Sequence, residues 1–406
     1  MAKEPAHSFK ELPLRLNWHI ASFIESDQDL CTFYRLCRST HDALDGHNMS
    51  FWRARFLSRF EKPTWTGCDY VKYKEAYKKR RQALMYGARF NRALGRNDPY
   101  DVKKAIDALE VLRDMIIDSF SEKTDDDREL AYDSKNMKTI KQVIVNHDLL
   151  EFIFPPESRI AKHIRCMPKQ LLYIVQVVLA PAILSLDYHN IMTSNFSFPK
   201  SQQVVYGNSP IFGGINSLDI DMEWVLRHIN FWKHHMIRKE ENTLFEAFRA
   251  LDEEDKPRFW SHQLKTGCSG PGKHWKGSYA FIERVYISHP PWSWIEHDPG
   301  CVRRLGQEFC ATGWLNALPP QQTIPGWQRM TMMKYFKDEN SAAMDLDALW
   351  AYEGVVLPGG EIVLCRWRCV NDGTGESMYS GTLILWCVDG PRYVRTAMEA
   401  DNGDIL

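Results

Sequence analysis

The sequence has almost no excess of one charge over the other. Lys and Arg together number 51, Asp and Glu number 52, and the formal net charge over 406 residues is −1. Electrostatic capture of nucleic acid or of an anionic membrane needs a clear basic excess or stripe. The one basic cluster, Lys78-Lys79-Arg80-Arg81, is typical of a solvated helix face. We therefore expect neither a nucleic-acid partner nor a membrane partner.

A long apolar run is also missing. The most apolar stretch, 171–186, is shorter than the roughly 20 residues that a spanning helix needs, and Gln176 and Pro181 interrupt it. We expect a buried helix there that kinks or ends near Pro181. The N-terminus has no apolar core of signal-peptide length. This predicts a protein that is not secreted and that works in the cytoplasm, the nucleus or both.

Cysteine motifs for metal binding are absent. The ten cysteines include no CxxC pair, and a zinc site at Cys365, Cys369 and Cys387 would lack a fourth ligand. We expect free thiols in a reducing compartment. His228 and His235 are seven residues apart on a probable helix, which is too far for one metal ion. Solvated or capping histidines are expected, with no metal and no other cofactor.

Catalytic motifs are absent too. The stretch GCSGPGKH, 267–274, satisfies GxxxxGK, but His274 stands where a nucleotide-binding loop needs Ser or Thr for Mg²⁺. A strand led by Trp275 follows it, whereas such a loop should open a helix. No GxSxG or HExxH occurs. We expect no catalytic residue and a protein that is not an enzyme, with an unrecognised active site as the remote alternative.

The chain divides into three regions that differ in the periodicity of their apolar residues, and together they predict an α+β fold. Residues 8–62 are expected to form a three-helix module, 63–265 a helical scaffold with one long polar loop at 190–217, and 266–400 an antiparallel, barrel-like domain. In the C-terminal region apolar and polar residues alternate, which predicts several short strands. Tight turns join these strands, among them Pro358-Gly359-Gly360. Five or more such strands suit a closed or nearly closed barrel, because closure removes exposed edges.

The N-terminal region carries more apolar side chains than so small a module can bury. Leu12, Leu16, Ile20, Phe23 and Ile24 recur at helical spacing and form one stripe. The stripe is expected to be covered by another protein, while Trp52 and Phe56 pack the module's own core.

The pattern LPLRLNWHIASFI, DLCTFYRLCR and FWRARF resembles an F-box. Arg15 and Thr40 depart from the family's usual residues at their positions. The resemblance implies a three-helix module that binds the adaptor Skp1, and through it a cullin, within a RING-type ubiquitin ligase. By position it implies that the adaptor-binding residues are Leu12, Pro13, Leu16, Ile20, Ile24, Leu30, Leu36 and Cys37.

The C-terminal stretches WKGSY, AYEGVVLPGGEIVLCRW and YSGTLILW resemble the barrel that follows the F-box in many fungal F-box proteins. The resemblance implies a binding domain, so the chain is expected to be a substrate receptor that captures a protein for ubiquitination. A carrier or sensor whose barrel holds a small apolar ligand is the alternative. The candidate substrate-binding residues are Trp275, Tyr279, Trp350, Arg366 and Trp386.

Overall fold

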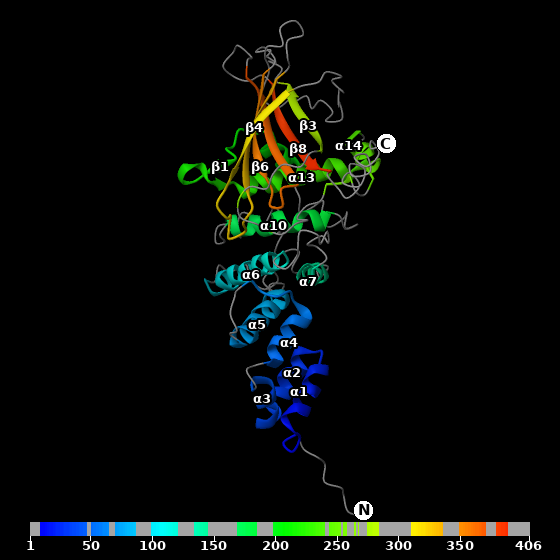
Figure 1. Cartoon of the computed structure of the whole chain (residues 1–406), viewed down its shortest axis with the longest axis vertical. Helices are drawn as coiled ribbons and strands as arrows, with labels where there is room; N and C mark the ends of the chain where they lie inside the picture. The colour runs from blue at the N-terminus through cyan, green and yellow to red at the C-terminus, as the bar shows by residue number, and fades with distance from the viewer. Residues whose placement is uncertain are drawn as a thin grey trace, which may run out of the picture. The chain divides into compact units, whose positions relative to one another are not determined.

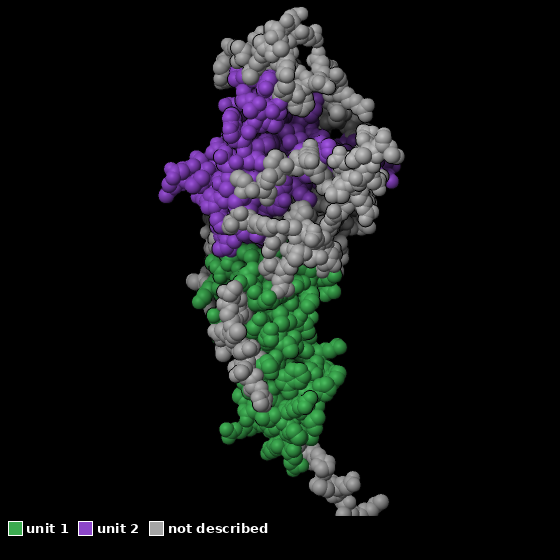
Figure 2. Space-filling view, viewed as in Figure 1, with its two compact units in different colours: residues 1–122, 133–152 green, residues 123–132, 153–406 purple. Residues whose placement is uncertain are grey.

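A computed structural model shows a mixed fold of helices and antiparallel sheet (Figure 1). Two compact units make up the chain, coloured green and purple in Figure 2. Unit 1 comprises residues 1–122 and 133–152, and unit 2 comprises 123–132 and 153–406. The structure describes residues 9–46, 50–64, 70–86, 99–120, 134–144, 169–184, 198–239, 243–252, 255–257, 264, 267, 274–283, 310–335, 349–370 and 379–388.

Unit 1 is helical throughout its described part. Its helices are α1 (Leu14–Phe23), α2 (Asp27–Leu36), α3 (Arg38–Asp45), α4 (Ser50–Arg59), α5 (Tyr70–Tyr86), α6 (Pro99–Asp118) and α7 (Lys135–Ile144). The described part of residues 8–62 therefore holds four helices, not the three predicted. The additional helix, α3, is short and polar, with Ala43 and Leu44 as its apolar residues, and the hydroxyl of Thr40 begins it by accepting from the Cys37 N–H at 3.1 Å.

The short N-terminal helices do bury a core of their own. Ser26 caps α2 by accepting from the Asp29 N–H, with acidic residues in the first turn. Trp52 and Phe56 are buried, as the sequence predicts. The largest fully buried side chains of this part are Leu44, Phe51, Phe56 and Phe60. Because α5, α6 and α7 belong to the same unit, the predicted scaffold 63–265 is divided between the two units.

Unit 2 contains a helical layer and a six-stranded sheet. Its helices are α10 (Lys169–Leu184), α12 (Phe198–Val205), the 3₁₀ turn η4 (Ile215–Ser217), α13 (Met222–Ile237) and α14 (Thr243–Arg249), and a two-stranded ladder joins β1 (Phe212–Gly213) to β2 (Asp219–Ile220). The predicted loop at 190–217 is thus partly regular structure, because α12 and β1 lie within it. Residues 190–197 lie outside the described residues.

Helix α13 is buried on nearly every side. Asp221 caps it by accepting from the N–H groups of Glu223 and Trp224. His228 and His235 are buried within it, so the expectation of solvated or capping histidines was wrong for both. The error arose because a helix packed all round carries no polar face from which its histidines' environment can be read.

The six strands form one antiparallel sheet in the order β3-β8-β7-β6-β5-β4. Strands β4 to β8 follow one another as a meander, of which β5 to β8 were predicted, and β3 pairs with β8. The strands are β3 (Trp275–Glu283), β4 (Cys310–Ala317), β5 (Gln328–Tyr335), β6 (Trp350–Val356), β7 (Ile362–Cys369) and β8 (Tyr379–Cys387). The sequence did not predict β4. The sequence RYVRTAM at 392–398 also predicts a strand, but it lies outside the described residues.

The turn between β6 and β7 has the predicted chemistry. The Gly360 N–H donates to the Leu357 carbonyl at 3.0 Å, and Gly359 has φ 99° at the position where a type II turn requires a positive value. Glu353 lies opposite Arg366 in the β6–β7 register and forms an ion pair with Arg329 on β5. Glu353 thus forms a cross-strand charge pair.

One face of the sheet, here called the inner face, is apolar and concave. Tyr279 on β3 and Tyr352 on β6 are three strand positions apart, about 14 Å on a flat sheet. Both nevertheless pack against one apolar cluster that includes Cys365 and Trp367. Burial raises the pKa of Tyr352, and the charges of Cys365 and Tyr279 add to that rise. The sheet therefore curls with this face inside. Among the described strands, β3 and β4 remain its two edges.

Candidate functional site

The most exposed apolar surface of unit 1 is a stripe along α1. The exposed fractions are 48% for Leu16, 36% for Ile20 and 72% for Phe23. Steps of four and three residues put these side chains on one side of the helix. Asn17 and Ala21, on the opposite side, are fully buried. Helix α1 therefore packs against the module through one side and exposes apolar side chains on the other.

The junction between α2 and α3 lies beside the start of this stripe. The Asn17 side chain donates to Ser39 Oγ at 2.9 Å, and Ser39 Oγ donates to the Leu12 carbonyl at 3.4 Å. Leu36, 50% exposed, ends α2 just before this contact. The residues Leu16, Ile20, Phe23 and Leu36 are called the apolar surface below.

The structure places the predicted adaptor-binding residues in three kinds of environment. Pro13 is exposed together with Leu16, Ile20 and Leu36, and Leu12, Ile24 and Cys37 are half-buried. Leu30 is buried in the core, so it supports the module from within. Phe23 is missing from the adaptor-binding residues that the resemblance implies, although it belongs to the periodic stripe and is the most exposed residue of that stripe.

Basic side chains stand around the apolar surface. Arg15 and His19 are exposed on α1, one turn apart, and Arg35 and Arg38 are exposed at the α2–α3 junction. Helix α1 has no acidic residue in its first turn. A partner that covers the apolar surface would meet these basic groups, together with the exposed Glu11 and Glu25 beyond the two ends of α1. Arg38 also forms an ion pair with Asp42 at 3.7 Å.

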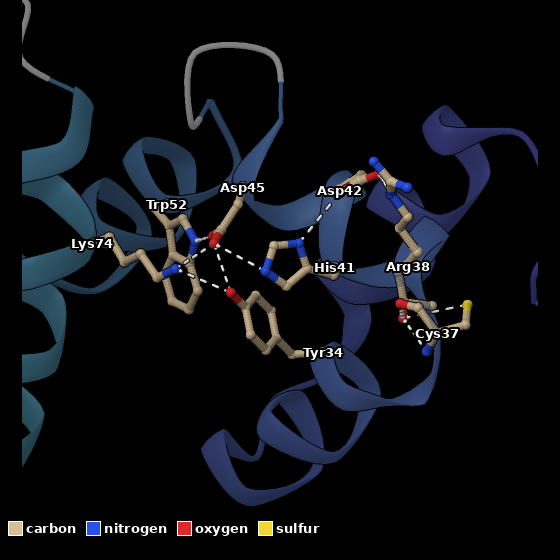
Figure 3. Close-up of polar contacts among 9 residues, drawn as sticks. Tyr34, Cys37, Arg38, His41, Asp42, Asp45, Trp52 and Lys74 are labelled. Atoms are coloured by element: carbon tan, nitrogen blue, oxygen red, sulfur yellow. Dashed lines mark hydrogen bonds and ion pairs between the residues drawn. The ribbon is translucent and has the colours of Figure 1, made fainter.

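Asp45 anchors the module by polar contacts from several helices (Figure 3). Its carboxylate accepts from the Tyr34 hydroxyl at 2.7 Å, from Trp52 Nε1 at 2.9 Å and from Lys74 Nζ at 2.5 Å. Burial acts to raise the pKa of Asp45, but these hydrogen bonds and the charge of Lys74 outweigh it and hold the pKa below its ordinary value. The contacts join α2, α3 and α4 to α5.

Asp27 has a similar role at the start of α2. It accepts from the Tyr77 hydroxyl at 2.7 Å and from Arg81 Nε at 2.5 Å, and Arg55 and Arg59 lie within 3.6 and 3.9 Å. Burial works against the ionised form, but the hydrogen bonds and positive charges lower the pKa of Asp27 overall. Both carboxylates thus join the helices that carry the apolar surface to α5.

In unit 2 the predicted substrate-binding residues do not converge. Trp275, Tyr279 and Trp350 pack on the inner face. Side chains alternate along a strand, and Arg366 and Trp386 therefore lie on the opposite face. There Arg366 Nη1 donates to the Ser209 carbonyl and Trp386 Nε1 to that of Asp255, each at 2.9 Å.

Two further residues of the inner face were not predicted. Gln328 is 1% exposed, and both polar atoms of its amide lack a hydrogen-bond partner in the part of the chain that the structure describes. Lys334 lies on the same face, and burial lowers its pKa. An aromatic, apolar surface with few polar groups is the chemistry of a site for small ligands.

A pocket of about 480 Å³ lies beside the β1–β2 ladder. Its walls come from the first turn of α10, the segment from Pro210 to Met222, and the β4–β5 turn at Pro320, Gln321 and Gln322. The sequence predictions missed it, because segments about 100 residues apart form it. The only local signal was glycine and polar residues in both turns.

The structure supplies no candidate metal centre in its described ranges, where no group of three or more His, Cys, Asp or Glu side chains could hold an ion. Cys31, Cys37, Cys365, Cys369 and Cys387 are free thiols. Of the GCSGPGKH stretch, residues 268–273 lie outside the described residues. No helix within the described ranges is both long and apolar enough to cross a membrane. Comparison of the chain with protein-family models, curated proteins and solved structures finds no match.

Proposed function

We propose that this chain is the substrate-recognition subunit of a ubiquitin ligase of the Skp1–cullin–RING type. In this proposal the N-terminal helices are an F-box that docks on Skp1, and unit 2 captures the protein to be ubiquitinated. The ligase chemistry belongs to the partner subunits, so the chain itself is not an enzyme and needs no cofactor. The cytoplasm and the nucleus are the proposed compartments.

The observation that carries this proposal is the apolar surface. Leu16, Ile20 and Phe23 stay exposed although the core beneath them, with Phe51 and Phe56, is complete. An exposed apolar patch on a folded protein marks an interaction site, and a few apolar anchors dominate the energy of such an interface. The resemblance of the sequence to an F-box implies that this partner is Skp1.

The charges around the surface give the partner a chemical description. Arg15, Arg35 and Arg38 stand at its edge, so they favour a partner with an apolar centre and acidic side chains around it. Complementary charge at the edge of an interface raises the association rate more than it raises the affinity. We therefore expect association with Skp1 to slow as the salt concentration rises.

Co-expression with Skp1 followed by gel filtration tests the proposal. The wild-type chain should elute as a complex, and the double variant Leu16→Asp with Ile20→Asp should elute alone. Both residues are exposed, so the variant should keep its helical circular dichroism. Val370→Asp is the matched control, since Val370 is an exposed apolar residue of unit 2, and it should keep the complex. Failure of the wild-type chain to bind Skp1, or binding by the double variant, would contradict the proposal.

Barrel closure belongs to the proposed architecture of the receptor domain. The curled sheet and the shared cluster between Tyr279 of β3 and Leu315 of β4 support closure, since they bring side chains from both edges to one core. A closed barrel should protect the backbone amides of β3 and β4 from hydrogen exchange as strongly as those of β7. Fast exchange along both edge strands would argue for an open sheet.

The second candidate function is a carrier or sensor for a small apolar ligand. The observation in its favour is Gln328, a buried amide without a hydrogen-bond partner among the described residues on the aromatic inner face. Buried polar groups are normally satisfied, so a bound molecule could provide the missing partner. Native mass spectrometry of the purified chain should then detect a bound compound that Gln328→Leu loses. A chain free of ligand in both forms would leave this candidate without support.

A further inference from the structure

The pocket beside the β1–β2 ladder has walls that hydrogen bonds hold in place. Gln321 accepts from the Ile220 N–H at 3.0 Å through Oε1 and donates to the Leu218 carbonyl at 3.2 Å through Nε2. Gln170 of α10 accepts from the Met222 N–H at 3.4 Å. These bonds join α10, the ladder and the β4–β5 turn. The pocket is therefore formed before any ligand arrives.

The turns that border the pocket contain backbone strain. The non-glycine residues with positive φ in the described ranges are Asn216, Ser217, Gln322 and Thr323, and all lie in the two turns beside it. Such conformations are energetically costly and gather at functional sites. Gly214 also has a positive φ, and the Asp219 carboxylate lies where a Cβ on Gly214 would stand.

The charged residues that line the pocket are all acidic. Asp219 and Asp221 line it, and none of the lining residues that the structure describes is Lys, Arg or His. The Asp219 carboxylate is on an exposed residue and has no ion pair with any described residue. Burial raises the pKa of Asp221, and Glu223 adds to this, while hydrogen bonds from Trp224 and Glu223 act against it. Asp221 Oδ1 already accepts from the N–H groups of Glu223 and Trp224, so a cation in the pocket would neutralise Asp219 and contact Asp221 through its other oxygen.

The loop between β1 and β2, whose two ends line the pocket, carries exposed apolar side chains and is here called the rim. Ile215 is 86% exposed and Leu218 is 40% exposed, and both lie on the loop between β1 and β2. Phe212 and Pro320 contribute apolar wall inside. A large apolar side chain at a loop tip costs solvation unless a partner covers it. The rim and the pocket together suit a basic side chain with apolar neighbours.

We propose that this pocket docks an extended segment of a partner protein by one arginine, whose guanidinium pairs with Asp219 and Asp221, while apolar neighbours cover Ile215 and Leu218. Arginine fits better than lysine because its planar fork can contact carboxylate and amide oxygens together. Gln322 supplies an amide at the mouth. The inference rests on the proposed receptor function, since it names the feature of the target that unit 2 would read.

Fluorescence polarisation with the full chain tests the inference. The probe is the fluorescein-labelled peptide Ser-Leu-Arg-Leu-Ser, and its partner peptide carries Gln in place of Arg. The arginine peptide should bind about tenfold more tightly, the difference expected from one charge-assisted contact. Asp219→Asn should remove this preference. Glu246→Gln, the same charge change on the exposed face of α14, should leave it intact.

Several outcomes would overturn the inference. They are equal binding of both peptides, no binding up to about 1 mM, or an arginine preference that survives Asp219→Asn. Competition by free arginine amide as strong as by the peptide would show that the pocket takes a small cation, and would also overturn docking. Skp1 binding is measured on the same preparations. If the wild-type chain binds Skp1 but shows no preference for the arginine peptide, only the docking inference is contradicted. If it prefers the arginine peptide but does not bind Skp1, only the receptor function is contradicted.

Discussion

Asn17 Nδ2 lies 2.9 Å from Ser39 Oγ, and this hydrogen bond joins α1 to α3 directly beneath the apolar surface. The same nitrogen donates to the Phe9 carbonyl at 3.1 Å. Asn17 is fully buried. The outward direction of Leu16 and Ile20 thus depends on a polar contact on the opposite side of their helix.

Asn17→Ala should therefore lower both stability and adaptor binding. Loss of a buried amide that satisfies two partners costs about 1–3 kcal/mol, measured by urea unfolding of the chain. Ser39→Ala should cost less, and the double variant less than the sum, because the two side chains share one bond. Leu16→Asp should weaken binding to Skp1 without this loss of stability. Unchanged unfolding of Asn17→Ala would show that the contact does not hold α1.

Acid should destabilise unit 1 through Asp27 and Asp45. Burial alone would raise both pKa values, but hydrogen bonds and neighbouring cations lower them below the ordinary value of 3.8. A depressed pKa means that the unfolded state takes up the proton first. The contribution to stability is complete above pH 3.8 and is lost as the pH falls through the lower pKa of the folded state.

Asp27→Asn and Asp45→Asn should flatten this acid-dependent loss, each at the expense of stability at neutral pH. Unfolding followed between pH 6 and pH 2 measures both effects. Asp29→Asn is the matched control, since Asp29 is an exposed acidic residue in the same turn as Asp27. Equal acid sensitivity in all variants would contradict the assignment.

The stripe on α1 and the meander were predictable because the spacing of apolar residues within each segment indicates its structure. Helical spacing from Leu12 to Ile24 and alternation along β5 to β8 need no tertiary information. Helix α3 was missed because it has eight residues, of which only Ala43 and Leu44 are apolar, and strand β4 was missed because its sequence does not alternate strictly. Capping by Thr40 begins α3, and pairing with β5 defines β4. Both causes lie outside the segment's own apolar pattern.

The candidate sites in unit 2 were not predictable for a different reason. The pocket combines Asp219 with Gln321, which are joined only by the fold. Arg366 and Trp350 were grouped by composition, but strand alternation sends them to opposite faces. Which aromatic residues meet depends on register and curvature, and neither can be read from one strand at a time.

Arg80 and Asp118 form a buried ion pair between α5 and α6. Their side chains are 6% and 4% exposed, and Asp118 also accepts from the Thr64 N–H at 2.8 Å. Asp118→Ala would leave the guanidinium buried without its partner, at a cost of about 3–5 kcal/mol. The double variant Arg80→Met with Asp118→Leu should cost much less, because it removes both charges. Unfolding in guanidinium chloride measures the free energy of unfolding of both variants. Equal losses of stability in the two would contradict the pairing argument.

His228 should make unit 2 sensitive to mild acid. Its Nδ1 donates to the Trp224 carbonyl at 2.8 Å, and Nε2 is buried without a partner among the described residues. Its ring packs against the Trp224 ring at a tilt of 30°, with the ring centroids 3.6 Å apart. Burial lowers the pKa of His228 from 6.5 to about 3, and the charge of Arg366 adds to the fall, against the hydrogen bond to Trp224.

Between these two values the unfolded state binds a proton that the folded state does not. Stability should therefore fall as the pH drops from 6.5 towards 3, by about 1.4 kcal/mol per pH unit for this group. His228→Phe keeps the ring packing against Trp224 and removes the titration, so its stability curve should be flatter by that slope. Tryptophan fluorescence during urea unfolding at pH 7.5, 6 and 5 measures the difference. Above pH 7 the gap between wild type and variant should be constant, because His228 is neutral in both states. A gap that does not change between pH 6 and pH 5 would show that another group causes the acid sensitivity.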